Sequence, residues 1–149
     1  MNALRAVGGI VVAVSLGGCG LDLIYADWKV DQLCKKDGGI TVYRHDVLPE
    51  QIKLPTGAVN MLALERAKVG DDYYFANTTT AIEPREPEIK RLEALLIRHK
   101  DGALLGKSVS YVRPTQNIGV PIFHSAAHVC PQGKSVATMV SQVFAIEKR

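Results

Sequence analysis

The spacing of apolar and polar residues predicts a helix near the start of the folded part of the chain. Val30, Leu33 and Cys34 fall on one helical face, and Asp27 before them is a residue type that caps helix starts. Two lysines and then a pair of glycines follow, an arrangement typical of a helix end. We therefore expect a helix over residues 28–36, capped by Asp27, with Cys34 directed at the core.

Two later segments have the composition of strands, and one suits a short helix. Residues 40–44 and 73–82 are rich in β-branched and aromatic side chains, and the second contains three consecutive threonines. Residues 58–69 are ambiguous, but their apolar spacing fits a short helix that ends at Gly-Asp-Asp. A loop bracketed by Pro49 and Pro55 separates this segment from the first strand.

The segment 89–99 is compatible with two structures. Its apolar side chains share a helical face, yet the same residues would form a long strand leading into a turn at Asp101-Gly102. Asp-Gly is a strong hairpin signal. Beyond it, Val109, Tyr111 and Arg113 alternate with small or apolar residues, as in a strand. We therefore favour a hairpin over 89–113.

The C-terminal part predicts one more element. Ser135 is placed to cap a helix, because the apolar residues from 136 to 144 follow helical spacing. Residues 143–146 would also serve as an edge strand, and residues 117–124 have the character of a loop with a possible short strand. The predicted fold is α+β: an N-terminal helix, an antiparallel sheet of roughly four strands centred on the hairpin, and a C-terminal helix or edge strand.

Composition narrows the class of protein. The chain has 149 residues, of which 47% are hydrophobic and 22% charged, which suits one folded domain rather than a disordered chain. The formal net charge is only +3, so there is no electrostatic footprint for nucleic acid, and we expect no nucleic-acid partner.

The first 18 residues differ from the rest. Arg5 is followed by an uncharged apolar run over residues 6–16, which is shorter than the ~20 residues that a membrane-spanning helix needs. A basic start, a short apolar run and small residues before a break are typical of a secretory signal. The break is Leu16-Gly17-Gly18-Cys19.

This tetrapeptide resembles the lipobox of bacterial lipoproteins. The resemblance implies cleavage between Gly18 and Cys19 and attachment of diacylglycerol to the Cys19 thiol. It divides the chain into a signal peptide (1–18), a lipidated tether (19–26) and one globular domain (27–149). Because Gly20 is not aspartate, the resemblance also implies an outer-membrane anchor facing the periplasm. The alternatives are an ordinary signal, or a buried N-terminal helix in which the cysteine is incidental.

A second resemblance covers about a third of the mature chain. Residues 28–43, with the sequence WKVDQLCKKDGGITVY, and the later Cys130-Pro131 are similar to segments of small envelope lipoproteins from Gram-negative genomes and prophages. The resemblance supports the predicted location. It transfers no activity, because none is established for that group.

If Cys19 carries lipid, Cys34 and Cys130 are the remaining cysteines. In an oxidising envelope such a pair usually forms a disulfide, which would fix the first helix to the segment before the last element. The alternatives are two free buried thiols, or a metal site in which His124 and His128 join Cys130. Prolines on both sides of the histidines weaken the metal interpretation.

Other possible catalytic patterns are weak. Two Gly-Lys-Ser triplets, at 106–108 and 133–135, lack the earlier glycine of a phosphate-binding loop and fit turn and cap positions. Glu83, Glu86 and Glu88 alternate beside prolines, as on a solvated surface.

The sequence therefore predicts a lipid-anchored, non-enzymatic module without a cofactor, which binds an envelope partner. The alternative is an envelope hydrolase or ligand-binding lipoprotein acting on cell-wall or lipid fragments. Such a protein would need a pocket in which groups such as His124, His128 and Glu88 converge.

Overall fold

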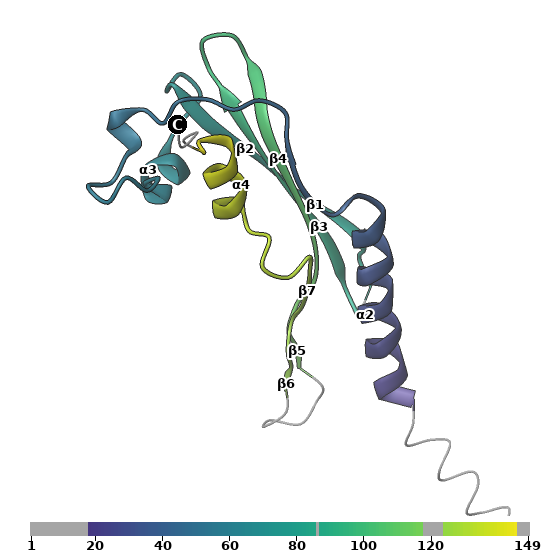
Figure 1. Cartoon of the computed structure of the whole chain (residues 1–149). Helices are drawn as coiled ribbons and strands as arrows, with labels where there is room; N and C mark the ends of the chain where they lie inside the picture. The colour runs from purple at the N-terminus through teal and green to yellow at the C-terminus, as the bar shows by residue number, and fades with distance from the viewer. Residues whose placement is uncertain (1–17, 86, 118–123, 146–149) are drawn as a thin grey trace, which may run out of the picture.

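A computed structural model describes residues 18–85, 87–117 and 124–145. Its elements are α2 (Gly18–Asp37), β1 (Gly39–Val42), the short 3-10 helix η1 (Glu50–Ile52), α3 (Met61–Arg66), β2 (Tyr73–Glu83), β3 (Ile89–Arg98), β4 (Ala103–Arg113), β5 (Gln116–Asn117), β6 (His124–Ser125), β7 (His128–Cys130) and α4 (Val136–Val143) (Figure 1). Helices and strands are mixed in one small domain, which confirms the predicted α+β class.

The main sheet is antiparallel and has five strands. Four of them lie in the order β1-β4-β3-β2, and β7 pairs with β4 beyond the end of β1. Thus β1 lies opposite residues 106–109 of β4, and β7 lies opposite residues 111–113. The short strands β5 and β6 pair with each other.

The central hairpin joins β3 and β4, so strand is the correct interpretation of residues 89–98. Pairing with neighbouring strands favours strand over helix for this segment, because β3 is hydrogen-bonded to β2 on one side and to β4 on the other. Gly102 has φ +65° in the connecting turn, a conformation that glycine adopts without steric cost. The sequence prediction of this hairpin is confirmed.

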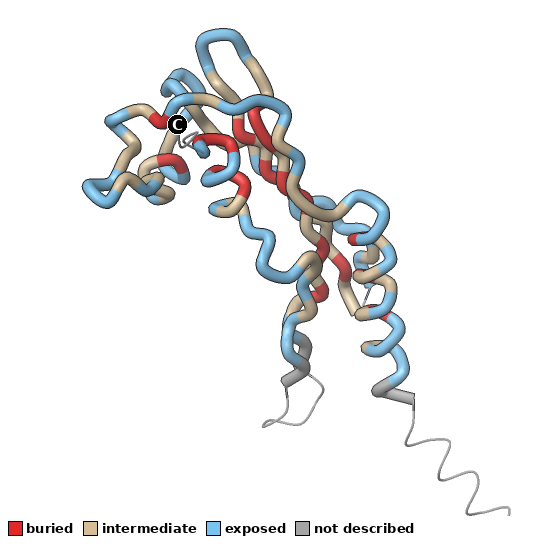
Figure 2. Tube along the Cα trace, viewed as in Figure 1, coloured by how far each residue is buried: buried red, intermediate tan, exposed pale blue. Residues whose placement is uncertain are grey.

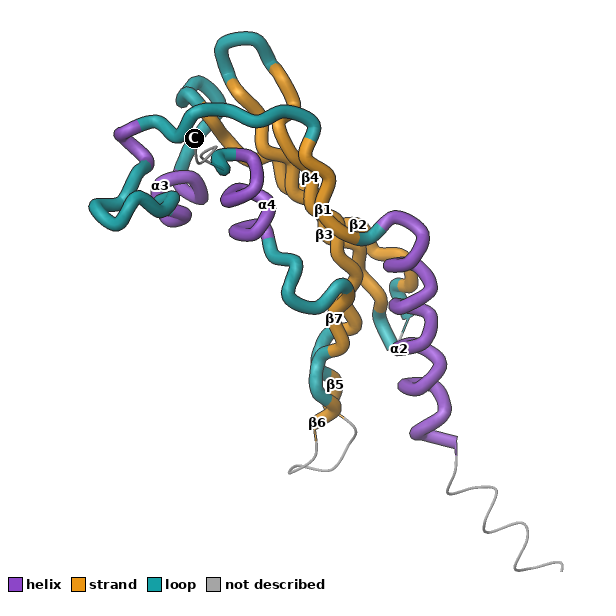
Figure 3. The backbone as a smooth tube through the Cα atoms, in the orientation of Figure 1, coloured by secondary structure: helices purple, strands orange, loops and turns teal. Residues whose placement is uncertain are grey.

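The sheet carries a helix on each face, and each face has its own core. Figures 1 and 3 show α2 on one side of the strands and α4 with α3 on the other. Buried positions gather where the helices meet the strands (Figure 2). The α2 core consists of Ala26, Val30, Cys34, Ile89, Val109 and Tyr111. The α4 core consists of Leu48, Leu64, Leu96, Leu105, Met139, Val140, Val143 and Phe144.

Helix α4 matches its prediction closely. The Ser135 hydroxyl accepts a hydrogen bond from the Thr138 amide at 3.3 Å, and this cap starts the helix. Gly106 of β4 lies beneath the helix, where a Cβ atom would come within 2.9 Å of Val143 Cγ2. The residue therefore permits close packing of helix on strand.

Two expected helix boundaries and one expected turn were wrong. Helix α2 begins at Gly18 and not at Asp27, so the segment expected as a tether is helical from its start. The reason lies in packing: Ala26 is buried against the sheet, and Asp27 bonds to Arg113 instead of capping the helix. Helix α3 ends at Arg66, before the Gly-Asp-Asp sequence. The triplet at 106–108 lies inside β4 and not in a turn.

Candidate functional site

The predicted lipid-attachment residue lies at the start of α2. Gly18 and Cys19 belong to the helical backbone, and Leu16 and Gly17 lie outside the described residues. The helix continues from Cys19 to Asp37 and contains Cys34 in its last turns. Cys19 is therefore connected to the folded domain through a continuous helix.

A disulfide joins Cys34 of α2 to Cys130 of β7, as the sequence predicted. The two Cα atoms are 5.9 Å apart, and 96 residues separate the cysteines along the chain. Cys34 is buried among the residues of the α2 core. Because its sulfur is in the disulfide, Cys130 is not free to join His124 and His128 as a metal ligand.

Ionic contacts hold the middle of α2 against β4 and β7. The Arg113 side chain is only 4% exposed, and its Nε donates to Asp27 Oδ1 at 2.5 Å. Its other nitrogens donate to the carbonyl oxygens of Pro114 and Ala126. One helical turn further along α2, Asp31 Oδ1 lies 2.9 Å from Nε2 of His128. The histidine singled out as a possible ligand therefore contributes to helix docking.

A second polar network holds the C-terminal end of α2. The Tyr111 hydroxyl donates to Asp37 Oδ1 at 2.6 Å, and this bond is the main reason why the pKa of Asp37 is lowered. Arg91 donates to the same carboxylate at 3.2 Å and pairs with Glu93 at 2.7 Å. Lys107 adds a longer contact to Glu93. The network therefore links the end of α2 to the strands β3 and β4.

The residues of the sequence-based hydrolase alternative have separate partners. His128 contacts Asp31, whereas Glu88 pairs with Lys90 at 3.0 Å. His124 belongs to β6 by its backbone, and its side chain, like Glu86, lies outside the described residues. Glu83 pairs with Lys29 of α2 at 2.7 Å. Across residues 18–85, 87–117 and 124–145, no three acidic, histidine or cysteine side chains form a metal-binding group.

A shallow groove crosses the sheet beside the start of α4. Its floor includes Ser108 and Ser110 of β4, and its wall includes Lys134 and Val136. The Ser108 side chain is buried at its base, with 5% relative exposure. The groove is open and mostly apolar, with two hydroxyl groups on its floor.

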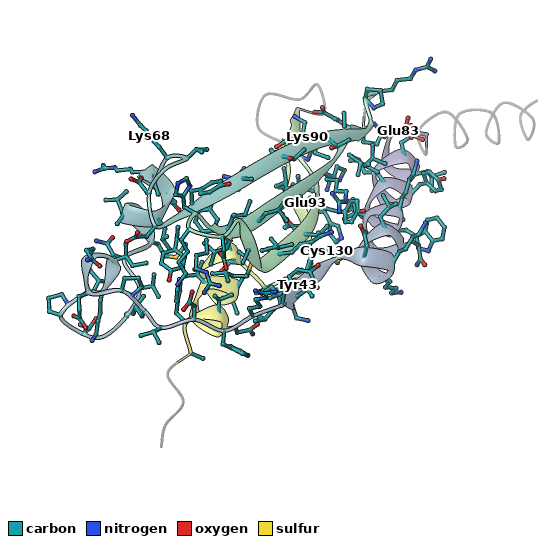
Figure 4. All side chains as sticks on the ribbon, turned by 90° about the horizontal axis from the view of Figure 1, so that it is seen from above. Tyr43, Lys68, Glu83, Lys90, Glu93 and Cys130 are labelled. Atoms are coloured by element: carbon teal, nitrogen blue, oxygen red, sulfur yellow. A yellow bond between two sulfur atoms is a disulfide. The ribbon has the colours of Figure 1, made fainter. Side chains whose placement is uncertain are left out.

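Among the strands that the structure describes, β2 has the longest edge without a pairing partner in the main sheet. This 11-residue strand pairs with β3 alone, and residues 77–82 are exposed and uncharged. Figure 4 shows the strand along one side of the sheet, with Glu83 at the end nearest α2. The backbone groups on such an edge are able to pair with a further strand.

A feature that sequence reasoning missed lies on the outward face of α2. Leu21, Ile24, Tyr25 and Trp28 are 65%, 68%, 59% and 55% exposed. Their spacing of three, four and seven residues was a signal of a second apolar helix face. Interpretation of residues 19–26 as a tether hid that signal. Among the helices that the structure describes, none is both long and apolar enough to pass through a bilayer.

Comparison of the chain with protein-family models, with curated proteins and with solved structures found no match.

Proposed function

We propose that this protein is an envelope lipoprotein, anchored through lipid on Cys19, whose domain is a non-enzymatic interaction module. The observation that carries the proposal is the distribution of the three cysteines. Cys34 and Cys130 form a disulfide, which is typical of proteins in oxidising compartments. The third cysteine, Cys19, is the one that follows the lipobox-like Leu16-Gly17-Gly18.

Tethering is the proposed mechanism. Acyl chains contribute about 0.8 kcal/mol for each buried CH₂, so two or three chains hold a protein on a bilayer almost permanently. Anchoring confines the domain to one surface and thereby raises its effective concentration toward partners on that surface. The outer membrane, with the domain in the periplasm, is the proposed location.

The outer edge of β2 supports an interaction role. An extended segment of an envelope protein would add to the sheet through main-chain hydrogen bonds, with the threonines of β2 beside it. The described part of β2 holds no charged side chain between Tyr73 and Ile82, so nothing on the strand itself opposes such pairing by charge.

The anchor is tested by measuring the mass of the mature N-terminus and the membrane association of the protein. We expect the chain to begin at Cys19 with acyl chains attached and to stay with the membrane in a high-salt wash. A Cys19→Ser variant should carry no acyl chains, while a Cys34→Ala/Cys130→Ala variant should keep its lipid. A chain that retains Met1, or wild-type protein released by salt, would contradict the proposal.

The interaction role is tested at the β2 edge. Lysines on an edge strand oppose pairing with another strand, so Thr78→Lys/Thr80→Lys should reduce cross-linking of the anchored protein to an envelope partner. Thr56→Lys/Thr115→Lys adds the same charge at exposed threonines in loops and serves as the matched control. Equal cross-linking by both variants would exclude the β2 edge as the contact surface.

A further inference from the structure

Helix α2 has two apolar faces, and the domain covers only one of them. Ala26, Val30 and Cys34 are buried against the sheet. With 3.6 residues per turn, Leu21 and Trp28 fall on the opposite side of the helix. Figure 1 shows α2 as the outermost layer on its side of the sheet, and no described element lies over its outward face.

The apolar residues on the outward face form a continuous stretch of the helix. Leu21, Ile24, Tyr25 and Trp28 follow one another along the helix, and the rings of Tyr25 and Trp28 are 5.7 Å apart. Exposed apolar side chains that occur singly are common on soluble domains, whereas a contiguous patch marks a contact surface. This patch therefore requires an occupant.

We propose that this face of α2 lies in the interfacial region of a lipid bilayer, an inference that rests on the proposed lipid anchor at Cys19. The anchor residue is in the first turn of the same helix, two residues before Leu21. Acyl chains inserted from that turn bring the adjacent patch to the membrane surface. An anchor within one helical turn of Leu21 keeps the patch close to the bilayer, which is therefore its proposed occupant.

The chemistry of the patch suits a membrane interface. Tyrosine and tryptophan are enriched at the boundary between headgroups and hydrocarbon, and here they lie beside two aliphatic side chains. Lys35, seven residues after Trp28, continues the same line of the helix, and Lys36 is exposed beside it. These ammonium groups match anionic headgroups. The helix would therefore lie flat, with its apolar part in the interface and its lysines at the lipid phosphates.

The interface between helix and sheet makes this orientation definite. Arg113 and His128 hold the middle of α2, Tyr111 holds its end, and the disulfide fixes Cys34. A helix held at these points cannot rotate about its axis without breaking them. The sheet consequently has one defined side toward the membrane, with α4 and the groove on the far side.

Trp28 is the only tryptophan in the chain, so its fluorescence reports on the proposed contact. Lipidated wild-type protein is reconstituted in vesicles of phosphatidylethanolamine and phosphatidylglycerol. The reference is a Cys19→Ser chain expressed without residues 1–18, in solution without detergent. Relative to it, we expect Trp28 to emit at shorter wavelength in the vesicles, to lose its quenching by iodide, and to be quenched by lipids brominated near the headgroup. Iodide quenching equal to that in solution, with the protein still bound to vesicles, would overturn the inference and leave the anchor proposal intact.

Variants separate the patch from the anchor. In the Cys19→Ser background, Leu21→Ser/Ile24→Ser should weaken partition into these vesicles about tenfold, because two exposed aliphatic side chains no longer enter the interface. Val47→Ser/Val69→Ser is the matched control, since both valines are highly exposed and lie outside α2. Equal partition of the two variants would contradict the inference. Shielding of Trp28 in protein that proves to carry no lipid would instead remove the anchor proposal and keep the membrane contact.

A second copy of the chain is the other possible occupant, and the same protein tests it. If Trp28 is shielded in solution without vesicles, and the Cys19→Ser chain elutes as a dimer that Leu21→Ser/Ile24→Ser dissociates, the patch is a dimer interface. That outcome overturns the membrane contact. The membrane contact is supported if the chain is a monomer in solution, with Trp28 open to quenching there and shielded only on vesicles.

Discussion

At the scale of single residues, the most strongly constrained charge is Arg113. Its guanidinium is buried beneath α2, bound to Asp27 and to two backbone carbonyl groups. We expect Arg113→Met to lower the free energy of unfolding by about 3 kcal/mol, because it leaves the Asp27 carboxylate without its buried partner. Urea unfolding measures the loss. Asp27→Asn/Arg113→Met should recover part of it, and a double variant no more stable than the single one would contradict this explanation.

Tyr73 makes stability depend on pH in the alkaline range. Burial, and then the hydrogen bond that its hydroxyl donates to Asp46 at 3.0 Å, raise the pKa of Tyr73 from 10.0 to about 12. The neutral hydroxyl is therefore favoured in the folded state. Its stabilising contribution is complete below pH 10 and is lost as the pH rises from 10 to about 12.

The pH dependence is measured by urea unfolding of wild type and Tyr73→Phe between pH 8 and the onset of alkaline unfolding. The wild type should lose stability above pH 10 more steeply than the variant, which keeps the contributions of Tyr111 and Lys29, whose pKa values are also raised. If the stability of the two proteins falls in parallel above pH 10, the pKa of Tyr73 is the same in the folded and the unfolded chain, which contradicts the prediction.

At the scale of elements, local pattern predicted most of the fold. The hairpin followed from Asp101-Gly102, and α4 followed from its cap and helical spacing, since both signals lie within a few residues. The start of α2 was missed because the helix is extended by tertiary packing of Ala26 and by the Asp27–Arg113 pair. The strand β7 was not predicted either, because three residues carry little periodicity and the pairing partner is distant in sequence.

The candidate site was predictable only in part. The pairing of Cys34 with Cys130 followed from cysteine count and expected compartment, and the structure confirms it. The contact between His128 and Asp31 was not predictable, since 97 residues separate them and neither has a recognisable local motif. The outward face of α2 had a helical signal, but recognising it required knowing that residues 18–26 are helical.

The contact between α4 and β4 depends on the absence of a side chain at Gly106. A Cβ at this position would lie 2.9 Å from Val143 and 3.0 Å from Met139, so Gly106→Ala should cost about 1–3 kcal/mol of stability. Ser110→Ala, on the same strand, should change stability by less than about 0.5 kcal/mol. In a double-mutant cycle, Val143→Ala should relieve part of the Gly106→Ala cost. If the losses of stability from Gly106→Ala and Val143→Ala simply add, the Cβ at position 106 does not clash with Val143, and α4 has moved away from β4 instead.

At the scale of the whole molecule, the disulfide links the proposed anchor helix to the sheet. It closes a loop of 96 residues, and in the chain-entropy argument a loop of about 100 residues contributes about 4.7 kcal/mol. We therefore expect Cys34→Ala/Cys130→Ala to unfold at lower urea concentration, with a loss of that order. If the variant does not fold, unfolding of the wild-type protein with and without reductant gives the same comparison. If the variant folds, reductant should leave its stability unchanged.

The same substitution has a consequence for the anchored protein. Without the disulfide, the C-terminal end of α2 is held by Tyr111 and Arg91 at Asp37, and the middle by Arg113 and His128. Limited proteolysis of membrane-bound protein should then release the sheet while the lipidated helix stays in the membrane, because the covalent link from α2 to β7 is missing. In wild type, cleavage in the exposed loop between β1 and α3 should leave the α2–β1 fragment and the rest of the domain together until reductant is added. Release of the wild-type domain without reductant would show that Cys34 and Cys130 are not joined in the mature protein.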